Sequence, residues 1–425
     1  MLSHILLMNM KYINVKPSHA EGIVFASGSK NIALPLICAC LITRSKVKLK
    51  NVPDILDVRN LLDILNDLNV ETKFTNNTLI IDSSNLLYED FSFSKIKKLR
   101  ASYYLLGALI PLNKKIIFTY PGGCNFQARP IDLHLYAFSC LNVKVEENDG
   151  FLVFTHDDLH SGIIDFSKKS VGATINALLC SCQISGKTLI KNPCFDYEVM
   201  QVCDFLNKIG GNICVDQSSN QIIVEGKRQF SIDEYTIKPD RIEVGTYALL
   251  GINMGKTLII NVDLSSLKAL LELFDDLKVN YSYGDNYLLV NKTFVNKEVK
   301  LILNTDPYLH TDLGPLLCAF LLKNSKISII EDLVYPKRNS YIEELNKMGA
   351  KIRVINDQII IFPHSVFNSN VTSGKDLRGT MSLLLCALFS NKEQQITDYN
   401  YLLRGYDNLF EKLKNLNIEI EESEK

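Results

Sequence analysis

Apolar residues occur in short runs that recur along the chain, and one plan of elements repeats six times. Each repeat opens on a small or polar segment, continues into an apolar helical stretch, breaks briefly and ends in a β-rich strand. The openings lie at residues 27–31, 100–102, 170–174, 241–246, 311–314 and 377–380. Their spacing of about 65–75 residues is that of a supersecondary unit of helices and strands.

The first helix of each repeat is apolar almost all round, which predicts that it is buried. These helices are expected at residues 32–42, 103–110, 175–182, 248–252, 316–322 and 381–389. Second helices are expected at residues 58–68, 199–209 and 340–348. Each is followed by alternating strands around turn residues, which predicts hairpins at residues 70–81, 211–224 and 351–361. Each repeat therefore reads as β-α-β-α-β-β, and the fold class is α/β.

Six such repeats indicate two lobes of three repeats each. A chain of 425 residues exceeds what one core usually supports, and no long linker interrupts it. The predicted crossing between the lobes lies near residues 235–240. An extended solenoid of six units is the alternative, but solenoid repeats rarely carry a different charged opening in each copy.

The composition argues against a nucleic-acid-binding protein, a zinc protein and a membrane-spanning protein. The chain is 47% hydrophobic and 22% charged with a formal net charge of −1, so it lacks the basic surplus of a nucleic-acid binder. The eleven cysteines show no CxxC or Cys/His ligand spacing, which indicates free buried thiols in a reducing cytoplasm and no zinc site. The first eight residues lack a basic lead-in and an adequate apolar core, so they are expected to make a poor signal peptide. No apolar run approaches the length of a membrane span.

Charged and polar side chains concentrate at the openings of the predicted buried helices. Helix N-termini carry partial positive charge and free N–H groups, so they bind anions. If both lobes present these ends to one cleft, the cleft suits a ligand with several phosphate or carboxylate groups. The residues concerned are Lys30, Asn31, Arg100, Lys168, Lys169, Arg241, Asp312, Asp376 and Arg378, and Arg129, Arg338 and Arg404 add to this set of charges.

One glycine-rich segment combines a thiol with charge. Cys124 follows Gly122 and Gly123, and Arg129 and Asp132 come shortly after it. Glycines allow a backbone to approach a ligand closely, arginine binds carboxylate or phosphate, and positive charge lowers a thiol pKa. The segment therefore predicts a catalytic loop that closes over an anionic substrate. A tight turn with a structural cysteine and ion pair is the other interpretation.

Motifs along nearly the whole chain point to one family. They lie at residues 27–35, 99–102, 121–124, 128–134, 170–174, 240–246, 311–313, 376–378 and 403–406. In this order they make the chain, from about residue 13 to 420, similar to the UDP-N-acetylglucosamine 1-carboxyvinyltransferase family of enolpyruvyl transferases. The resemblance implies two inside-out α/β barrel lobes, each of three βαβαββ units with buried helices. It implies an N-terminal lobe of residues 30–237 and a discontinuous C-terminal lobe of residues 1–29 and 238–425.

The resemblance also implies a reaction. The enolpyruvyl group of phosphoenolpyruvate is transferred to the 3′-hydroxyl of UDP-N-acetylglucosamine, and phosphate is released by addition and elimination. This is the first committed step of peptidoglycan precursor synthesis. No metal or organic cofactor is implied, and fosfomycin-type epoxides are expected to alkylate Cys124.

The matched positions imply roles for individual residues. Cys124 corresponds to the proton donor, and Asp312 to the carboxylate that handles the hydroxyl proton. The phosphoenolpyruvate site is implied at Lys30, Asn31, Arg129, Arg378 and Arg404, of which Lys30, Arg129 and Arg404 are also catalytic. The UDP-sugar site is implied at Arg100, Arg129, Pro130, Ile131, Asp132, Leu133, Lys168, Lys169, Ser170, Val171, Asp312 and Val334. Arg338 and Asp376 correspond to positions that act in lobe closure.

Three departures from the family pattern leave alternatives open. A usual Arg-Glu-Pro-Glu is replaced around Asp196, a lid glycine is replaced by Gln127, and a Phe-Pro pair is replaced by Leu309 and His310. These changes are compatible with a catalytically weakened UDP-sugar-binding paralogue. The other alternative is enolpyruvyl transfer to shikimate 3-phosphate, but the sister enzymes with that activity lack the Pro-Gly-Gly-Cys loop.

Overall fold

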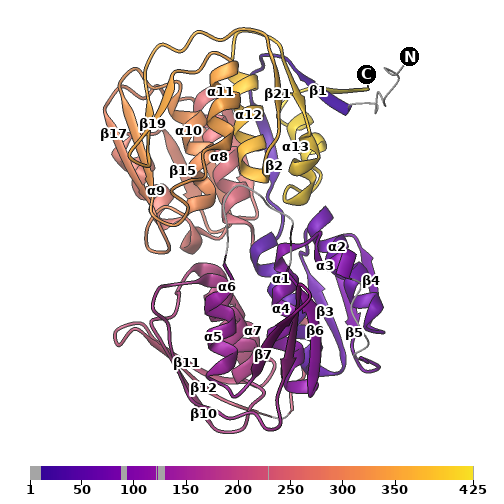
Figure 1. Ribbon diagram of the computed structural model, residues 1–425. Helices are drawn as coiled ribbons and strands as arrows, with labels where there is room; N and C mark the ends of the chain where they lie inside the picture. The colour runs from indigo at the N-terminus through magenta and orange to yellow at the C-terminus, as the bar shows by residue number, and fades with distance from the viewer. Residues whose placement is uncertain (1–10, 88–92, 121, 123–129, 228, 425) are drawn as a thin grey trace, which may run out of the picture. The chain divides into compact units, whose positions relative to one another are not determined.

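The computed structural model describes residues 11–87, 93–120, 122, 130–227 and 229–424, and these residues form two compact units. The N-terminal unit spans residues 28–238, and the C-terminal unit combines residues 11–27 with residues 239–424. Each unit has its own hydrophobic core. Figure 1 shows the helices and strands of both units.

The described part of the N-terminal unit contains three sheets. The first has the order β13-β3-β5-β4, with β3 (Lys46–Lys50), β4 (Glu71–Thr75), β5 (Thr78–Asp82) and β13 (Glu234–Thr236). The second has the order β6-β8-β7, with β6 (Lys115–Thr119), β7 (Lys144–Asn148) and β8 (Phe151–Thr155). The third has the order β11-β12-β10-β9, with β9 (Ile163–Asp165), β10 (Lys187–Lys191), β11 (Asn212–Asp216) and β12 (Gln221–Glu225).

Three helices form the interior of this unit, and others lie outside them (Figure 1). The inner helices are α1 (Lys30–Ala39), α4 (Tyr104–Leu109) and α6 (Val171–Ser181), which are buried over most of their length because their sequences are apolar on every side. The outer helices α2 (Leu56–Asp67), α5 (Asp132–Ser139) and α7 (Tyr197–Lys208) each bury one face. Short elements complete the unit: α3 (Phe93–Ile96), η1 (Cys40–Thr43), η2 (Arg100–Tyr103) and η3 (Ile110–Leu112).

The C-terminal unit has the same plan, with three sheets in the described residues. Their orders are β15-β16-β14-β2, β17-β18-β20-β19 and β21-β22-β1-β23. The strands are β1 (Lys11–Val15), β2 (Glu21–Phe25), β14 (Lys256–Ile260), β15 (Tyr281–Gly284), β16 (Tyr287–Asn291), β17 (Val299–Leu303), β18 (Ser328–Asp332), β19 (Ile352–Ile355), β20 (Gln358–Ile361), β21 (Val371–Ser373), β22 (Gln394–Thr397) and β23 (Ile420–Glu424). The inner helices are α8 (Arg241–Met254), α10 (Gly314–Leu321) and α12 (Leu377–Phe389). Outside them lie α9 (Lys268–Asp276), α11 (Ser340–Lys347) and α13 (Leu409–Lys414), with η4 (Leu264–Ser266), η5 (Thr311–Leu313) and η6 (Tyr399–Arg404).

Strand pairing makes the C-terminal unit discontinuous in sequence. β2 precedes α1 in the chain, but it pairs in parallel with β14 of the C-terminal unit. β13 precedes α8 in the chain, but it pairs in parallel with β3 of the N-terminal unit. The chain therefore crosses between the units twice, once after β2 and once after β13.

The mixed α/β class that the repeats predict is confirmed. The predicted second helices 58–68, 199–209 and 340–348 correspond to α2, α7 and α11, with ends that differ by at most two residues. The fourth inner helix was predicted too short, at residues 248–252, because α8 already begins at the charged Arg241. Arg241 and Glu243 are nevertheless buried, so they do not mark a surface segment. Among the described residues, no helix combines the length and the apolar composition that a membrane span requires.

The inner helices α4 and α6 pack closely at Gly107. A Cβ atom on Gly107 of α4 would lie 2.6 Å from Asn176 Oδ1 and 2.9 Å from the Asn176 carbonyl oxygen on α6. Gly107→Ala should therefore lower the free energy of unfolding by about 1–3 kcal/mol through overpacking. Chemical denaturation followed by circular dichroism measures this change, with Ser139→Ala on the exposed side of α5 as the control. Equal stability of the two variants would contradict the close packing.

Candidate active site

The described site residues are divided between the two units. The N-terminal unit holds Lys30, Asn31, Arg100, Pro130, Ile131, Asp132, Leu133, Lys168, Lys169, Ser170 and Val171. The C-terminal unit holds Asp312, Val334, Arg338, Asp376, Arg378 and Arg404. Cys124, Gln127 and Arg129 lie outside the described residues, so their predicted roles stay predictions.

A chain of ion pairs connects three helix starts in the C-terminal unit. Arg338 donates from Nη1 to Asp312 Oδ1 at 2.9 Å and from Nη2 to Asp376 Oδ1 at 2.8 Å. Arg378 donates from Nε to Asp312 Oδ2 at 3.3 Å. Asp376 also caps α12, because its Oδ1 accepts from the backbone N–H groups of Arg378 and Gly379. The fold therefore brings together four residues that were predicted for the site from the sequence. They are Asp312, Arg338, Asp376 and Arg378.

Arg378 is the member of this cluster with unused hydrogen-bonding capacity. Its side chain is almost fully buried at 1% exposure. Neither Nη1 nor Nη2 makes a hydrogen bond of normal geometry to a described residue. The nearby Tyr406 and Asp312 side chains raise the pKa of Arg378 against the effect of burial. The guanidinium carbon lies 5.4 Å from the centre of the Tyr406 ring, within the range of a cation–π contact. A buried fork of N–H donors without partners is costly unless an anion accepts from it.

The charges in the cluster fix its protonation state. Burial alone would raise the pKa of Asp312, but Arg378 and Arg338 outweigh burial and hold this pKa well below its usual range. Burial would lower the pKa of Arg338, but Asp376 and Asp312 outweigh it and raise this pKa further. Asp312 is therefore a carboxylate and both arginines are cations throughout the neutral pH range.

The turn beside Asp312 is held by a second aspartate. Thr311 donates its hydroxyl to Asp332 Oδ2, and the backbone N–H groups of Val334 and Tyr335 both donate to Asp332 Oδ1 at 2.9 Å. Val334, predicted for the UDP-sugar site, is half-buried on this turn. Arg404 ends η6 and is half-buried.

In the N-terminal unit, Lys30 is the first residue of α1 and pairs with a buried carboxylate. Its Nζ lies 2.8 Å from Asp57 Oδ2 on α2, and the Asp57 side chain is 3% exposed. The pair fixes the position of the lysine charge at the start of a buried helix. Asn31, the next residue, is half-buried.

Arg100 contacts a buried cluster of aromatic and polar side chains. Its guanidinium carbon is 5.2 Å from the centre of the Tyr103 ring, and the Tyr103 and His134 ring centres are 5.2 Å apart. His134 Nδ1 is 2.8 Å from Asn176 Nδ2, and Asn176 Oδ1 accepts from the backbone N–H of Gly107. Side-chain contacts thus connect Arg100, at the start of η2, with α5 and α6.

The other predicted UDP-sugar residues lie at the starts of α5 and α6. Pro130 and Asp132 are exposed, and Ile131 and Leu133 are buried. Lys168 and Lys169 are exposed before α6, and the Ser170 hydroxyl caps that helix by accepting from the backbone N–H of Ala173 at 3.3 Å. Val171 is half-buried. These residues provide two helix starts, of which only the one at α6 carries a side-chain cap.

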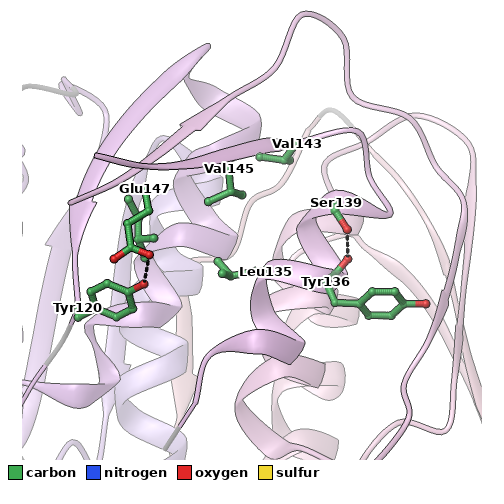
Figure 2. A pocket seen from close by; sticks show the side chains of 8 residues that line it. Tyr120, Leu135, Tyr136, Ser139, Val143, Val145 and Glu147 are labelled. Atoms are coloured by element: carbon green, nitrogen blue, oxygen red, sulfur yellow. Dashed lines mark hydrogen bonds between the residues drawn. The ribbon is translucent and has the colours of Figure 1, made fainter. Parts of the chain in front are cut away.

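A separate pocket lies beside these elements (Figure 2). It has a volume of about 400 Å³, and the Tyr120 hydroxyl donates to Glu147 Oε2 at its edge. The pocket is lined by Tyr120, Leu135, Tyr136, Ser139, Val143, Val145, Glu147 and Leu152. None of the described site residues lines it, so we do not include it in the candidate active site.

Comparison with known proteins places the chain in a family. Residues 15–413 match the family model described as EPSP synthase (3-phosphoshikimate 1-carboxyvinyltransferase). The chain belongs to the EPSP synthase family. A UDP-N-acetylglucosamine 1-carboxyvinyltransferase 2 from Latilactobacillus sakei strain 23K is 34% identical over 402 residues, covering 93% of this chain and 95% of that protein. A protein of the same name from Bacillus subtilis strain 168 is 32% identical over 400 residues, covering 93% and 92%.

Two solved structures agree with the fold. The crystal structure of the enolpyruvyl transferase NikO from Streptomyces tendae matches with a TM-score of 0.89 at 20% identity, covering 98% of this chain and 100% of that one. An EPSP synthase from Acinetobacter baumannii matches with a TM-score of 0.75 at 14% identity, covering 97% and 100%. At these identities the two structures support the fold alone.

Two of the departures noted in the sequence lie in described parts of this family member. His310 accepts from the backbone N–H of Asp312 through Nδ1 at 3.1 Å, so it caps the turn that carries the predicted base. A proline at this position would offer no side-chain acceptor. Asp196 is buried at the residue before α7. The His310 departure therefore adds a hydrogen bond at the site.

Several residues that shape the site were not singled out from the sequence. Asp57 gave no signal, because one aspartate on an amphipathic helix is ordinary. Asn176 gave a usable signal, since it is a lone amide inside the apolar run of α6. Tyr406 and His134 lie inside motifs shared with the family, but only the structure places them against Arg378 and Arg100.

His134 should make stability depend on pH. Burial, and then the charge of Arg100, lower its pKa from 6.5 to about 4. The unfolded chain therefore binds a proton near pH 6.5 that the folded chain does not bind until about pH 4. The free energy of unfolding should fall as pH decreases through this window, by up to about 1.4 kcal/mol per pH unit.

Melting temperatures measured between pH 7.5 and 4.5 test this expectation. His134→Gln should reduce the dependence on pH, and His160→Gln, at an exposed histidine of the same unit, should leave it unchanged. The same slope in His134→Gln and in the unsubstituted protein would show that His134 is not responsible.

Proposed function

We propose that this chain transfers the enolpyruvyl group of phosphoenolpyruvate to the 3′-hydroxyl of UDP-N-acetylglucosamine and releases phosphate. The relatives named for this reaction are 32–34% identical over nearly the full length of the chain. The structural observation that carries the proposal is the buried Arg378 fork beside the ionised Asp312. This pair offers an anion site next to a proton acceptor. The product would begin peptidoglycan precursor synthesis.

The proposed chemistry has two steps. In the addition, the sugar hydroxyl oxygen bonds to C2 of phosphoenolpyruvate, Asp312 takes the hydroxyl proton, and Cys124 gives a proton to C3. In the elimination, C3 returns a proton to the Cys124 thiolate, and the double bond between C2 and C3 forms again. The C2–O bond to phosphate breaks, and Asp312 gives the hydroxyl proton to the departing phosphate. The atoms balance without a metal or an organic cofactor, so the proposal includes neither.

The buried charges explain how Asp312 could act as a base. Without a substrate, Arg378 and Arg338 keep its pKa too low for efficient proton transfer. Phosphoenolpyruvate beside Arg378 adds negative charge, which offsets the arginines and raises the pKa of Asp312. In the proposal, substrate binding thereby activates the base.

The remaining roles follow the family pattern. Lys30, Asn31, Arg129 and Arg404 complete the phosphoenolpyruvate site, and their charge stabilises the departing phosphate. The starts of α5 and α6, with Arg100 and Val334, hold the UDP-sugar. Arg338 and Asp376 couple the anion site to closure of two lobes, which we propose to be inside-out α/β barrels. Ten described cysteines are free and mostly buried, and this supports placing the reaction in the reducing cytoplasm.

The proposed activity has a direct test. Purified protein should release inorganic phosphate from phosphoenolpyruvate only when UDP-N-acetylglucosamine is present. Release with shikimate 3-phosphate as the acceptor would contradict the proposal and favour the activity that the family description names. Saturable UDP-sugar binding without phosphate release from either acceptor would instead identify a catalytically weakened paralogue.

Cys124→Ser tests the proton donor. The substitution should lower kcat by about 10²–10⁴-fold at neutral pH, because a hydroxyl is a much weaker acid than a thiol. The loss should grow as pH rises. Cys214→Ser, at an exposed cysteine on β11, is the matched control and should retain activity.

The same two variants identify the reactive thiol. A fosfomycin-type epoxide should inactivate the unsubstituted protein and Cys214→Ser by adding one adduct per chain, detected by mass spectrometry. Cys124→Ser should carry no adduct. Sustained activity with the epoxide in excess would argue against Cys124 as an exposed, reactive thiol.

A further inference from the structure

Tyr406 lies between the anion-binding arginine and the inner helix α8. On one side its ring lies against the Arg378 guanidinium. On the other side its hydroxyl is 2.9 Å from Thr246 Oγ1. Tyr406 and Thr246 are both buried, so water does not compete for either contact.

The hydrogen-bond pattern fixes which way the tyrosine hydroxyl points. Thr246 donates its only hydroxyl hydrogen to the Ile242 carbonyl oxygen at 2.7 Å, one turn earlier in α8. The Thr246 oxygen can therefore only accept from Tyr406. The Tyr406 hydrogen is directed at α8, and Tyr406 has no further hydrogen to donate to a substrate anion.

We propose that Tyr406 and Thr246 form a support that orients Arg378 for phosphoenolpyruvate, so that Tyr406 is a positioning residue and a determinant of affinity for this substrate. The inference rests on the proposed function. The Arg378 Nε is held by Asp312, and the Tyr406 ring restricts the plane of the guanidinium. Nη1 and Nη2 make no hydrogen bond of normal geometry to a described residue, so they form a fork that can donate to a carboxylate or a phosphate. The Thr246 bond fixes the ring itself.

The neighbouring residue Tyr247 provides a matched control. Tyr247 follows Thr246 on α8 and is as deeply buried as Tyr406. Its hydroxyl has no hydrogen-bond partner among the described residues. Tyr406→Phe and Tyr247→Phe thus remove the same atom from buried tyrosines in one core. Only the first breaks the support. Thr246→Val removes the acceptor, and Thr246→Ser keeps it.

Steady-state kinetics separate positioning from general loss of structure. Tyr406→Phe and Thr246→Val should each raise KM for phosphoenolpyruvate by about tenfold, the size expected for one hydrogen bond that orients a charged group. KM for UDP-N-acetylglucosamine should stay within about twofold, as should both constants in Tyr247→Phe and Thr246→Ser. In an Arg378→Lys background, Tyr406→Phe should have no further effect, because the fork it positions is gone. Equal effects of Tyr406→Phe and Tyr247→Phe, or a parallel rise of both KM values, would overturn the proposal.

Binding without turnover separates this inference from the proposed activity. Isothermal titration with phosphoenolpyruvate alone should show about tenfold weaker binding to Tyr406→Phe than to the unsubstituted protein and to Tyr247→Phe. A protein that binds phosphoenolpyruvate but transfers nothing to UDP-N-acetylglucosamine would refute the proposed function, while the comparison of these affinities would still decide the role of Tyr406. No phosphoenolpyruvate binding in the unsubstituted protein would overturn both.

Discussion

Burial of whole helices is the constraint on which the rest of this structure depends. A helix enclosed on every side brings its unpaired N-terminal N–H groups into the interior, where they need acceptors. Asp240 and Asp376 supply these acceptors for α8 and α12. A buried carboxylate in turn needs a cation, and Arg338 pairs with Asp376. Arg338 also pairs with Asp312, which pairs with Arg378. The candidate anion site is thus a consequence of capping buried helices.

The sequence predicts the fold well where side-chain polarity matches burial. Inner helices such as α6 and α12 are apolar on all sides, and outer helices such as α2 are amphipathic, so their patterns are clear. Prediction fails at α8, where Arg241 pairs with Asp306 and Glu243 with Lys412 inside the protein. Pattern reading treats such charges as surface positions, since their partners are distant in the sequence.

Some residues of the candidate site could be predicted from the sequence, and others could not. The charged residues at helix openings were visible in the sequence, and the structure joins Asp312, Arg338, Asp376 and Arg378 in one cluster. The partners that give these charges their chemistry were not visible. Asp57 beside Lys30, and Thr246 behind Tyr406, are ordinary residues until tertiary contacts bring them together. Cys124 and Arg129 stay predictions, because no described residue reports on them.

The pairing of β1 has a consequence for synthesis on the ribosome. β1 lies between β22 and β23 and pairs antiparallel with both, so residues 11–15 and 420–424 share one sheet. The C-terminal unit cannot complete this sheet until almost the entire chain has been made. The N-terminal unit has all its residues by residue 238 and can fold first. Until β22 and β23 have been made, β1 is a strand without its partners, and a nascent chain that stalls late exposes the edges of β1 to aggregation.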